Sequence, residues 1–272
     1  MSDIHPLLEH VTSALRSAGA QAVVLFGSFA RGEANPQSDV DVLAIGPSDH
    51  PGLYEWRDNR LVVASWATAG DVRAQFTNPG SVGAIIPGWR EARILFDPQG
   101  VAAAIQADAH AWTWDRIDAA LCSAHIGDQV AGLAEEALKL IAALRAGKHT
   151  TAAIQRSVIA LRMAGIMALR RRVLYGSENR LWDMLADEMG DPWAAAQTCA
   201  LGLNGDPFEA TCRAALELYA LTAAEVFSDL DAEQRRIVAA TLEEIIREVR
   251  TLPNTTYWNS KGSAQKCGQV LM

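Results

Sequence analysis

The segment of residues 25–43, LFGSFARGEANPQSDVDVL, constrains the fold of this chain more than any other segment. Residues 22–26 form a short apolar run that predicts a buried strand. Gly27 and Ser28 end this run before a helical pattern that begins at Phe29. At such a turn, bare backbone N–H groups and the Ser28 hydroxyl can hold an anion. The segment therefore predicts an anion cradle between a strand and a short helix.

Two acids follow on a second predicted strand, residues 39–45, with the sequence DVDVLAI. Asp39 and Asp41 are two residues apart, and side chains at that spacing point to the same face of a sheet. Two neighbouring carboxylates suit Mg²⁺, which prefers one or two carboxylates together with substrate phosphates. The pattern predicts a magnesium site next to the cradle. The alternative is a strand, a polar loop and two exposed acids without function.

The spacing Gly-Ser-x-x-Arg-Gly, followed by Ser-Asp-x-Asp, resembles the signature of the DNA polymerase β-like nucleotidyltransferase superfamily. Within it, the chain is most similar to the bacterial aminoglycoside nucleotidyltransferases (adenylyltransferases) and their relatives. The resemblance implies one or two Mg²⁺ ions on Asp39 and Asp41, with ATP or another nucleoside triphosphate as co-substrate. It implies nucleotide binding by a set of six residues: Gly27, Ser28, Arg31, Ser38, Asp39 and Asp41.

Members of this superfamily usually add a third carboxylate from a later strand, and here the chain departs from the pattern. The predicted strand 61–67 contains no Asp or Glu. Asp71 is the first replacement candidate, although an acid at a helix start is also typical of a cap. Some relatives take a general base from the helical domain, for which Glu135 and Glu136 are the candidates. The alternative for both glutamates is a solvated position on a helix surface.

The remaining pattern predicts an α+β fold in two domains. Apolar positions at helical spacing over residues 4–18, a strand at 93–98 and a short helix at 70–76 complete the small sheet domain. Residues 80–89 are too apolar and glycine-broken for an ordinary solvent loop. From residue 99 an alanine- and leucine-rich helical pattern predicts helices over 99–110, 113–146, 150–174, 178–189, 192–203, 207–226 and 231–250.

As in the resembling family, we expect a small mixed β-sheet nucleotidyltransferase domain followed by an all-α helical bundle domain. The predicted boundaries are 1–98 for the first domain, 99–252 for the second and 253–272 for a tail. Neither a signal sequence nor an uninterrupted apolar run of about 18 residues is present, which predicts a cytoplasmic protein without a membrane partner. The four cysteines are scattered and are expected to be reduced thiols.

The formal net charge of −8 disfavours a protein that wraps a nucleic-acid backbone and fits a small cationic substrate better. The leading hypothesis is magnesium-dependent transfer of a nucleoside monophosphate, AMP from ATP, to a hydroxyl of a small molecule such as an aminoglycoside-like antibiotic. A second hypothesis is an antitoxin or regulator that adenylylates a protein. A third is a nucleotide-binding module without catalysis, which the missing third acid motivates. A homodimer is left open.

Overall fold

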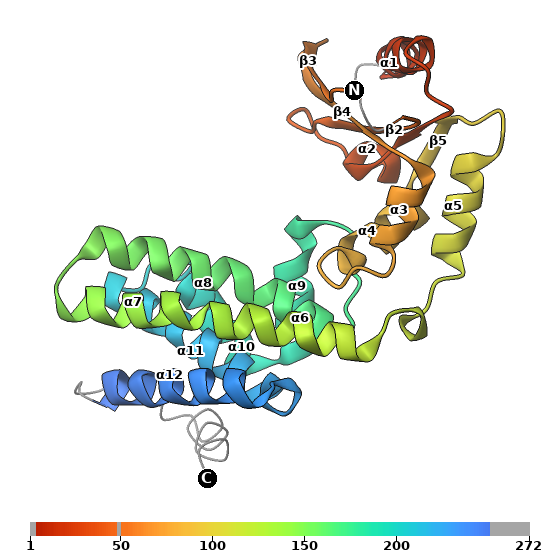
Figure 1. The fold of residues 1–272 in the computed structure, drawn as a ribbon. Coiled ribbons are helices and arrows are strands. Elements are labelled where there is room, and N and C mark those ends of the chain that lie inside the picture. Colours follow the sequence, from red (N-terminus) through yellow and green to blue (C-terminus); the bar gives the residue numbers. More distant parts are fainter. Residues whose placement is uncertain (1–3, 48–49, 251–272) are drawn as a thin grey trace. The chain divides into compact units, whose positions relative to one another are not determined.

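The computed structural model describes residues 4–47 and 50–250. The chain divides into two compact units (Figure 1). The first contains the residues up to Ile117 together with the segment Leu174–Glu178, and the second contains the rest. The predicted tail, 253–272, lies outside the described residues, and the domain boundaries predicted from the sequence stay predictions. The α+β fold class is confirmed, because a small mixed sheet precedes a helical region.

A five-stranded mixed sheet forms the centre of the first unit, with the strand order β3-β4-β2-β1-β5. Strands β2 and β4 are parallel, and the other neighbours are antiparallel. Helix α2 follows β1 directly, and α3 follows β4. The elements are α1 (His5–Ser17), β1 (Ala22–Leu25), α2 (Gly27–Arg31), β2 (Val40–Ile45), β3 (Leu53–Arg57), β4 (Arg60–Ala67), α3 (Ala69–Gln75), α4 (Val82–Glu91), β5 (Arg93–Phe96) and α5 (Val101–His110).

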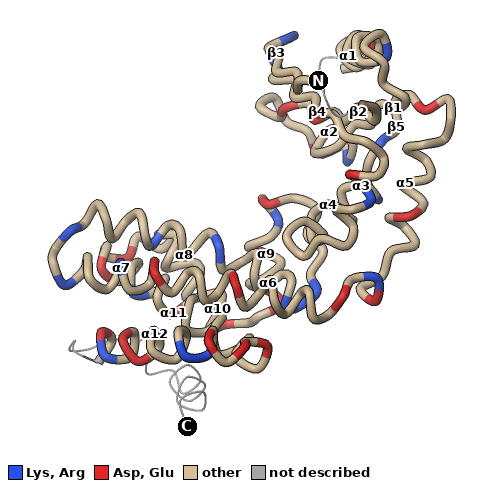
Figure 2. The backbone as a smooth tube through the Cα atoms, in the orientation of Figure 1, with Lys and Arg blue, Asp and Glu red and all other residues tan. Residues whose placement is uncertain are grey.

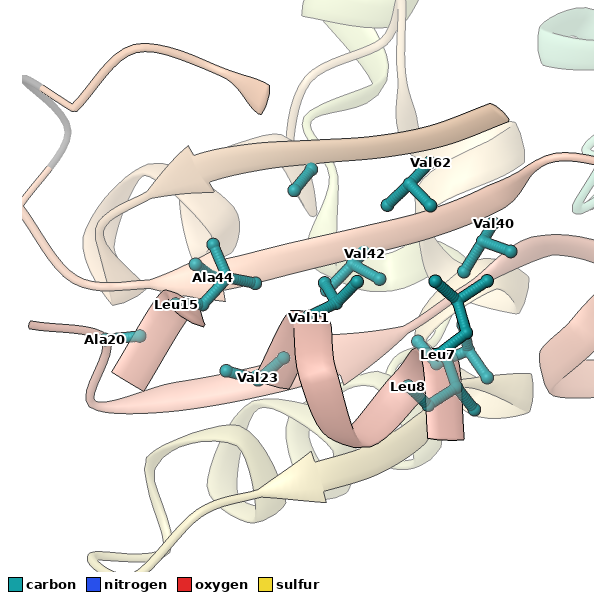
Figure 3. Packing of buried hydrophobic residues seen from close by; sticks show 12 residues of the cluster. Leu7, Leu8, Val11, Leu15, Ala20, Val23, Val40, Val42, Ala44 and Val62 are labelled. Atoms are coloured by element: carbon teal, nitrogen blue, oxygen red, sulfur yellow. The ribbon is translucent and has the colours of Figure 1, made fainter. Parts of the chain in front are cut away.

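One face of this sheet packs against α1 and forms the core of the first unit (Figure 3). The apolar positions predicted for this helix supply the contact, because Leu7, Leu8, Val11 and Leu15 are all buried. They meet the buried side chains of the strands, which are Val23, Leu25, Val40, Val42, Ala44, Val62 and Ala64. The spacing of 3.6 residues on the helix and of two on the strands brings these side chains together. This packing fixes β2 in place.

Strand β3 is absent from the sequence prediction and pairs with β4 as an antiparallel hairpin. The turn consists of Asp58 and Asn59, both with positive φ, the conformation that a tight hairpin turn requires. Asn and Asp tolerate this conformation better than other residues with a Cβ. The segment Leu53–Arg57 is therefore a strand that was not predicted.

Residues 80–89, which are too apolar for a solvent loop, form most of helix α4. Trp89 is fully buried in this helix, and its ring meets Phe26 edge-on with the centroids 5.2 Å apart. The returning segment Leu174–Glu178 packs on the same helix, where the Tyr175 N–H donates to the carbonyl of Gly83 over 2.8 Å. A Cβ at Gly83 would lie 2.6 Å from the Tyr175 ring. Gly83 therefore permits this close approach.

The second unit is helical, as predicted. Its helices are α6 (Ala119–Gly132), α7 (Ala134–Arg145), α8 (His149–Arg170), α9 (Glu178–Met189), α10 (Asp191–Ala200), α11 (Phe208–Val226) and α12 (Ala232–Arg250). The single helix predicted for 113–146 was wrong, since the chain there forms a 3₁₀ turn, Trp114–Arg116, and two helices. Asp118 caps α6 through the N–H of Ala120, and Gly132, a poor helix former, precedes the break before α7.

Helix α11 lies at the centre of this second unit and packs against α8 and α10. The Tyr219 hydroxyl donates to the carbonyl of Val130 on α6, and burial raises the pKa of this phenol above its usual value. Helix α8 is long and apolar enough to cross a membrane, but half of the qualifying window is buried, as in a core helix of a bundle. Acidic and basic residues both lie along α12 (Figure 2), and such a mixture of charges is typical of a solvated helix face.

Candidate functional site

The turn between β1 and α2 lies directly against Asp41. Gly27 has a φ of +69°, which favours glycine, and an added Cβ there would lie 2.7 Å from Oδ2 of Asp41. The Phe26 N–H donates to the carbonyl of Asp41 over 2.9 Å, which fixes the turn to β2. The structure thus brings the turn predicted as a cradle close to one of the two predicted acids, and the lack of a Cβ at Gly27 permits this close approach.

Asp41 is half-buried on β2, whereas Asp39 comes just before this strand and is exposed. Burial raises the pKa of Asp41, the charge of Asp39 raises it further, and the Arg31 guanidinium lowers it. The two carboxylates are therefore close enough for their charges to repel. A divalent cation between them would relieve this repulsion and compensate the burial of Asp41. The donor pair thus fits a hard cation such as Mg²⁺.

Arg31 is the last residue of α2 and forms ion pairs with two acids, one in the loop after α2 and one on α4. Its Nε donates to Oε2 of Glu33 over 2.8 Å, and its Nη1 lies 3.8 Å from Oε2 of Glu91 on α4. Only 13% of its side chain is exposed. These ion pairs tie α2 to α4, and the same guanidinium lowers the pKa of Asp41. Structural support is the role of Arg31 that these contacts favour.

Ser28 and Ser38 belong to the turn and to the loop that follows it. Ser28 is half-buried in the first turn of α2, and its carbonyl accepts the N–H of Glu33 over 2.9 Å. The Ser38 hydroxyl accepts the N–H of Asn35 over 2.9 Å. Ser38 thus closes the loop that leads into Asp39. Its contact with a nucleotide stays a prediction.

Arg60 is a supporting residue that sequence reasoning missed. Its Nη1 donates to the carbonyls of Asn35 and Ser38 over 3.0 and 3.3 Å, and its guanidinium lies over the ring of Phe29 at 4.9 Å. It therefore joins the start of β4 to the loop before Asp39 and to α2. The strand pattern gave no signal for this role, because the partners are backbone carbonyls that lie more than 20 residues away.

A pocket of about 360 Å³ opens on the sheet face that carries Asp41, opposite the face that packs against α1. Strands β2 and β4 and helix α3 form most of its wall, with Phe26 and Ile85 at the sides. Most of the lining is apolar, and its acids are Asp41 and Asp71. The lining from the two strands and α3 includes Asp41, Leu43, Val63, Ser65, Asp71 and Gln75.

The register of the parallel strands identifies the position next to Asp41. Asp41 pairs with Val63 and Leu43 pairs with Ser65, so these side chains share one face. The residue of β4 closest to Asp41 is therefore apolar. Among the residues that the structure describes, no group of three His, Cys, Asp or Glu side chains is placed to hold a metal ion. Among the described residues, the third carboxylate that is missing from the sequence of β4 is therefore not replaced by one from another element.

Asp71 lines the same pocket as Asp41, and it caps α3. Its Oδ2 accepts hydrogen bonds from the N–H and the hydroxyl of Thr68 over 3.1 and 2.7 Å. These hydrogen bonds lower the pKa of Asp71. The Asp71 N–H donates in return to the Thr68 hydroxyl, which completes a capping box. The carboxylate is therefore engaged at the helix start, and its catalytic role stays a prediction.

Glu135 and Glu136 occupy the first turn of α7 in the second unit. Glu135 is exposed and pairs with Lys139 one turn later, with Oε1 and Nζ 2.5 Å apart. Glu136 is half-buried. This pairing is typical of a solvated helix surface. A role for either residue as a general base stays a prediction.

Comparison with known proteins bears on this first unit. Residues 8–70 match the nucleotidyltransferase domain family. The match includes Gly27, Ser28, Asp39 and Asp41, and it supports nucleotidyl transfer as the general activity. A solved structure described as a nucleotidyltransferase-like protein from Exiguobacterium sibiricum 255-15 is 12% identical, with a TM-score of 0.48, and the alignment covers 99% of this chain and 87% of that chain. No curated protein matches the chain.

Proposed function

We propose that this protein transfers a nucleoside monophosphate, AMP from ATP, to a hydroxyl of a small aminoglycoside-like molecule, with Mg²⁺ as cofactor. The observation that carries the proposal is the close approach of the Gly27 turn to the carboxylate of Asp41, because a phosphate held at this turn would lie next to a cation on Asp41. The nucleotidyltransferase domain match over residues 8–70 supports its coarser part, nucleotidyl transfer in general.

Asp39 and Asp41 would hold one or two Mg²⁺ ions, and a bound ion supplies neutralisation of the polyphosphate charge. The backbone of Gly27 and the hydroxyl of Ser28 would hold the terminal phosphates. Arg31 keeps α2 in place through Glu33 and Glu91. Arg60 keeps the loop before Asp39 in place. Most of the rate enhancement would come from positioning and from stabilisation of charge.

In the proposed reaction, the acceptor hydroxyl oxygen forms a bond to the α-phosphorus of ATP. The bond from this phosphorus to the oxygen that bridges the α- and β-phosphates breaks, and pyrophosphate leaves with that electron pair. The hydroxyl proton passes to water or to a carboxylate base, for which Asp71, Glu135 and Glu136 are the candidates. The products are adenylylated acceptor and pyrophosphate.

The product in which a labelled phosphate of ATP appears tests this reaction directly. The protein is incubated with Mg²⁺, an aminoglycoside such as kanamycin, and ATP labelled at either the α- or the γ-phosphate. We expect the α-label to appear on the acceptor and the γ-label in pyrophosphate, and we expect EDTA to abolish both. Transfer of the γ-label to the acceptor would identify phosphoryl transfer and contradict the proposal.

A second candidate function is a nucleotide-binding module without transfer, and the apolar Val63 next to Asp41 favours it. This candidate predicts magnesium-dependent uptake of ATP, measured by calorimetry, with no pyrophosphate release in the presence of any acceptor. Pyrophosphate release that requires a small hydroxyl compound would exclude it. Label transfer to a partner protein without a small acceptor would favour protein adenylylation instead.

A further inference from the structure

The sheet face that carries Asp41 continues beyond the pocket onto the edge of the sheet. Asp41 pairs with Val63 on β4, and Val63 pairs with Tyr54 on β3, so one row of side chains crosses three strands on a single face. Trp56 and Leu61 form the neighbouring pair on the same face. We call Tyr54, Trp56, Leu61 and Val63 the aromatic platform. Strand β3 is one of the two edge strands of the sheet (Figure 1).

The two aromatic residues of this platform are unusually exposed. Tyr54 is 75% and Trp56 71% exposed, and Leu61 is 38% exposed. Residues two apart on a strand lie roughly 6.6 Å apart, about the width of a six-membered ring system. Adjacent strands lie about 4.8 Å apart, so the backbone of Tyr54 is about 10 Å from that of Asp41. A ligand of two or three linked rings can span this distance.

The charges on this face select the kind of ligand. On β3, β4 and β2, the positions that share it are Tyr54 and Trp56, then Leu61, Val63, Ser65 and Ala67, then Asp41, Leu43 and Ile45, and none of these is Lys or Arg. A phosphate-bearing strand of nucleic acid would find no Lys or Arg on this face of the three strands, because Arg57 and Arg60 belong to the opposite face. An ammonium group would be attracted by the faces of Trp and Tyr, and this face has no Lys or Arg to repel it.

The platform also lies on the appropriate side of the site. Strand β2 has β1 on one side, which leads into the Gly27 turn, and β4 on the other. Attacking and leaving oxygens lie roughly in line on opposite sides of the reacting phosphorus. With the terminal phosphates at the Gly27 turn, the acceptor approaches from the side of β4 and β3.

We infer that the aromatic platform binds the acceptor, and that the acceptor is a cationic, ring-containing hydroxyl compound such as an amino sugar. This inference rests on the proposed function for the direction of transfer. The apolar faces of the sugar rings lie on Tyr54 and Trp56, and an ammonium group lies over one of the two aromatic rings. The two aromatic residues therefore determine acceptor specificity without touching the nucleotide.

Direct binding measurements test the inference without requiring turnover. The probes are kanamycin, which has both rings and ammonium groups, maltotriose, which has rings without charge, and spermine, which has charge without rings. Calorimetry with the full chain should give the tightest binding for kanamycin. Tyr54→Ala and Trp56→Ala should each weaken kanamycin binding about ten-fold, whereas Trp56→Phe should retain most of it.

Glu55→Gln is the matched control, because Glu55 lies between the two aromatics on the same strand and points to the opposite face, where it pairs with Arg57. It should leave kanamycin binding unchanged. None of these variants should change the uptake of Mg²⁺ with a non-hydrolysable ATP analogue, and circular dichroism should show that each one folds.

The outcomes separate this inference from the proposed function. In one outcome, the wild-type chain binds kanamycin but takes up no nucleotide, and Trp56→Ala loses the kanamycin binding. This outcome would support the platform and contradict the proposed transfer. In another outcome, the wild-type chain takes up nucleotide, and either it binds no kanamycin or both alanine variants bind kanamycin as well as it does. Either result would overturn the platform. A change from dimer to monomer in Trp56→Ala, with unchanged kanamycin binding, would assign the face to self-association and would also overturn it.

Discussion

The two faces of the N-terminal sheet are built from alternate residues of the same strands and differ in what covers them. Val40, Val42 and Ala44 of β2 point toward α1 and are buried, whereas Asp41 and Leu43 point toward the pocket and remain partly exposed. The buried neighbours hold the strand, and the strand holds the carboxylate. A side-chain period of two thus lets one short strand serve both the core and the site.

The largest expected effect is on the open face, at Asp41. Asp41→Asn removes the charge that faces the Gly27 turn while it keeps the size of the side chain. We expect the rate of pyrophosphate release to fall by about 10²-fold or more, because the variant loses a preorganised ligand for the cation. Asp58→Asn, in the hairpin turn, is the control for the loss of one carboxylate, since Asn suits its positive φ. Equal rates of pyrophosphate release in the two variants would show that Asp41 is not a catalytic residue.

Substitution of one leucine on each side of the sheet compares how much the covered face and the open face contribute to the free energy of unfolding. Leu8 of α1 is 3% exposed in the core, and Leu61 of β4 is 38% exposed on the open face. Leu8→Ala should lower the unfolding free energy of the first unit by about 2–5 kcal/mol through lost burial and a cavity. Leu61→Ala should change it by no more than about 0.5 kcal/mol.

Native-state hydrogen exchange at the amides of β2 measures this difference within the first unit alone. A similar loss of protection in both variants would mean that the face carrying Asp41 is covered as well as the face against α1. The comparison of the two faces would then fail.

The covered face could be predicted from the sequence, and the open face only in part. The apolar spacing of α1 and the runs of β1, β2 and β4 follow the periods of a buried helix face and buried strands. The segment Leu53–Arg57 has the alternation of a strand in the opposite phase, because its largest apolar side chains, Tyr54 and Trp56, face solvent. A pattern search that expects apolar residues to be buried therefore misses it.

The candidate site shows the same division. Gly27 and Asp41 could be selected as candidates because glycine suits a left-handed turn and paired carboxylates are typical ligands of a hard cation. Arg60 could not, because it acts on backbone carbonyls brought near only by the fold. Asp71 was a candidate for a third carboxylate at a position more typical of a cap, and its hydrogen bonds with Thr68 establish the cap in the structure.

A glycine pair tests how closely the turn must approach Asp41. Gly27 and Gly32 have nearly the same φ, +69° and +74°, but a Cβ at Gly32 would meet nothing within 4 Å. Both alanine variants carry the cost of a left-handed conformation, about 1–2 kcal/mol. Only Gly27→Ala should displace the Asp41 carboxylate, and it should weaken magnesium-dependent ATP uptake by about ten-fold or more relative to Gly32→Ala. Equal affinity in both variants, measured by calorimetry, would show that the contact does not matter for binding.

The smallest expected effect is a gain of function on the open face. Val63 lies beside Asp41 in the parallel register, so Val63→Asp would place a third carboxylate next to the pair. A further charged oxygen ligand should tighten Mg²⁺ binding several-fold, since ligand charge tunes the affinity of hard-cation sites. Ala67→Asp is the matched control, because it adds the same charge to the same strand and face, four residues further along.

Calorimetric titration with Mg²⁺ should therefore distinguish Val63→Asp from Ala67→Asp. Equal affinities would mean that only the overall negative charge matters and that the cation does not lie between the neighbouring strands. A gain in affinity confined to Val63→Asp would mean that the wild-type chain keeps an apolar wall where a third ligand fits. Val63 would then be the position at which the open face keeps part of its apolar surface in place of a third carboxylate beside Asp39 and Asp41.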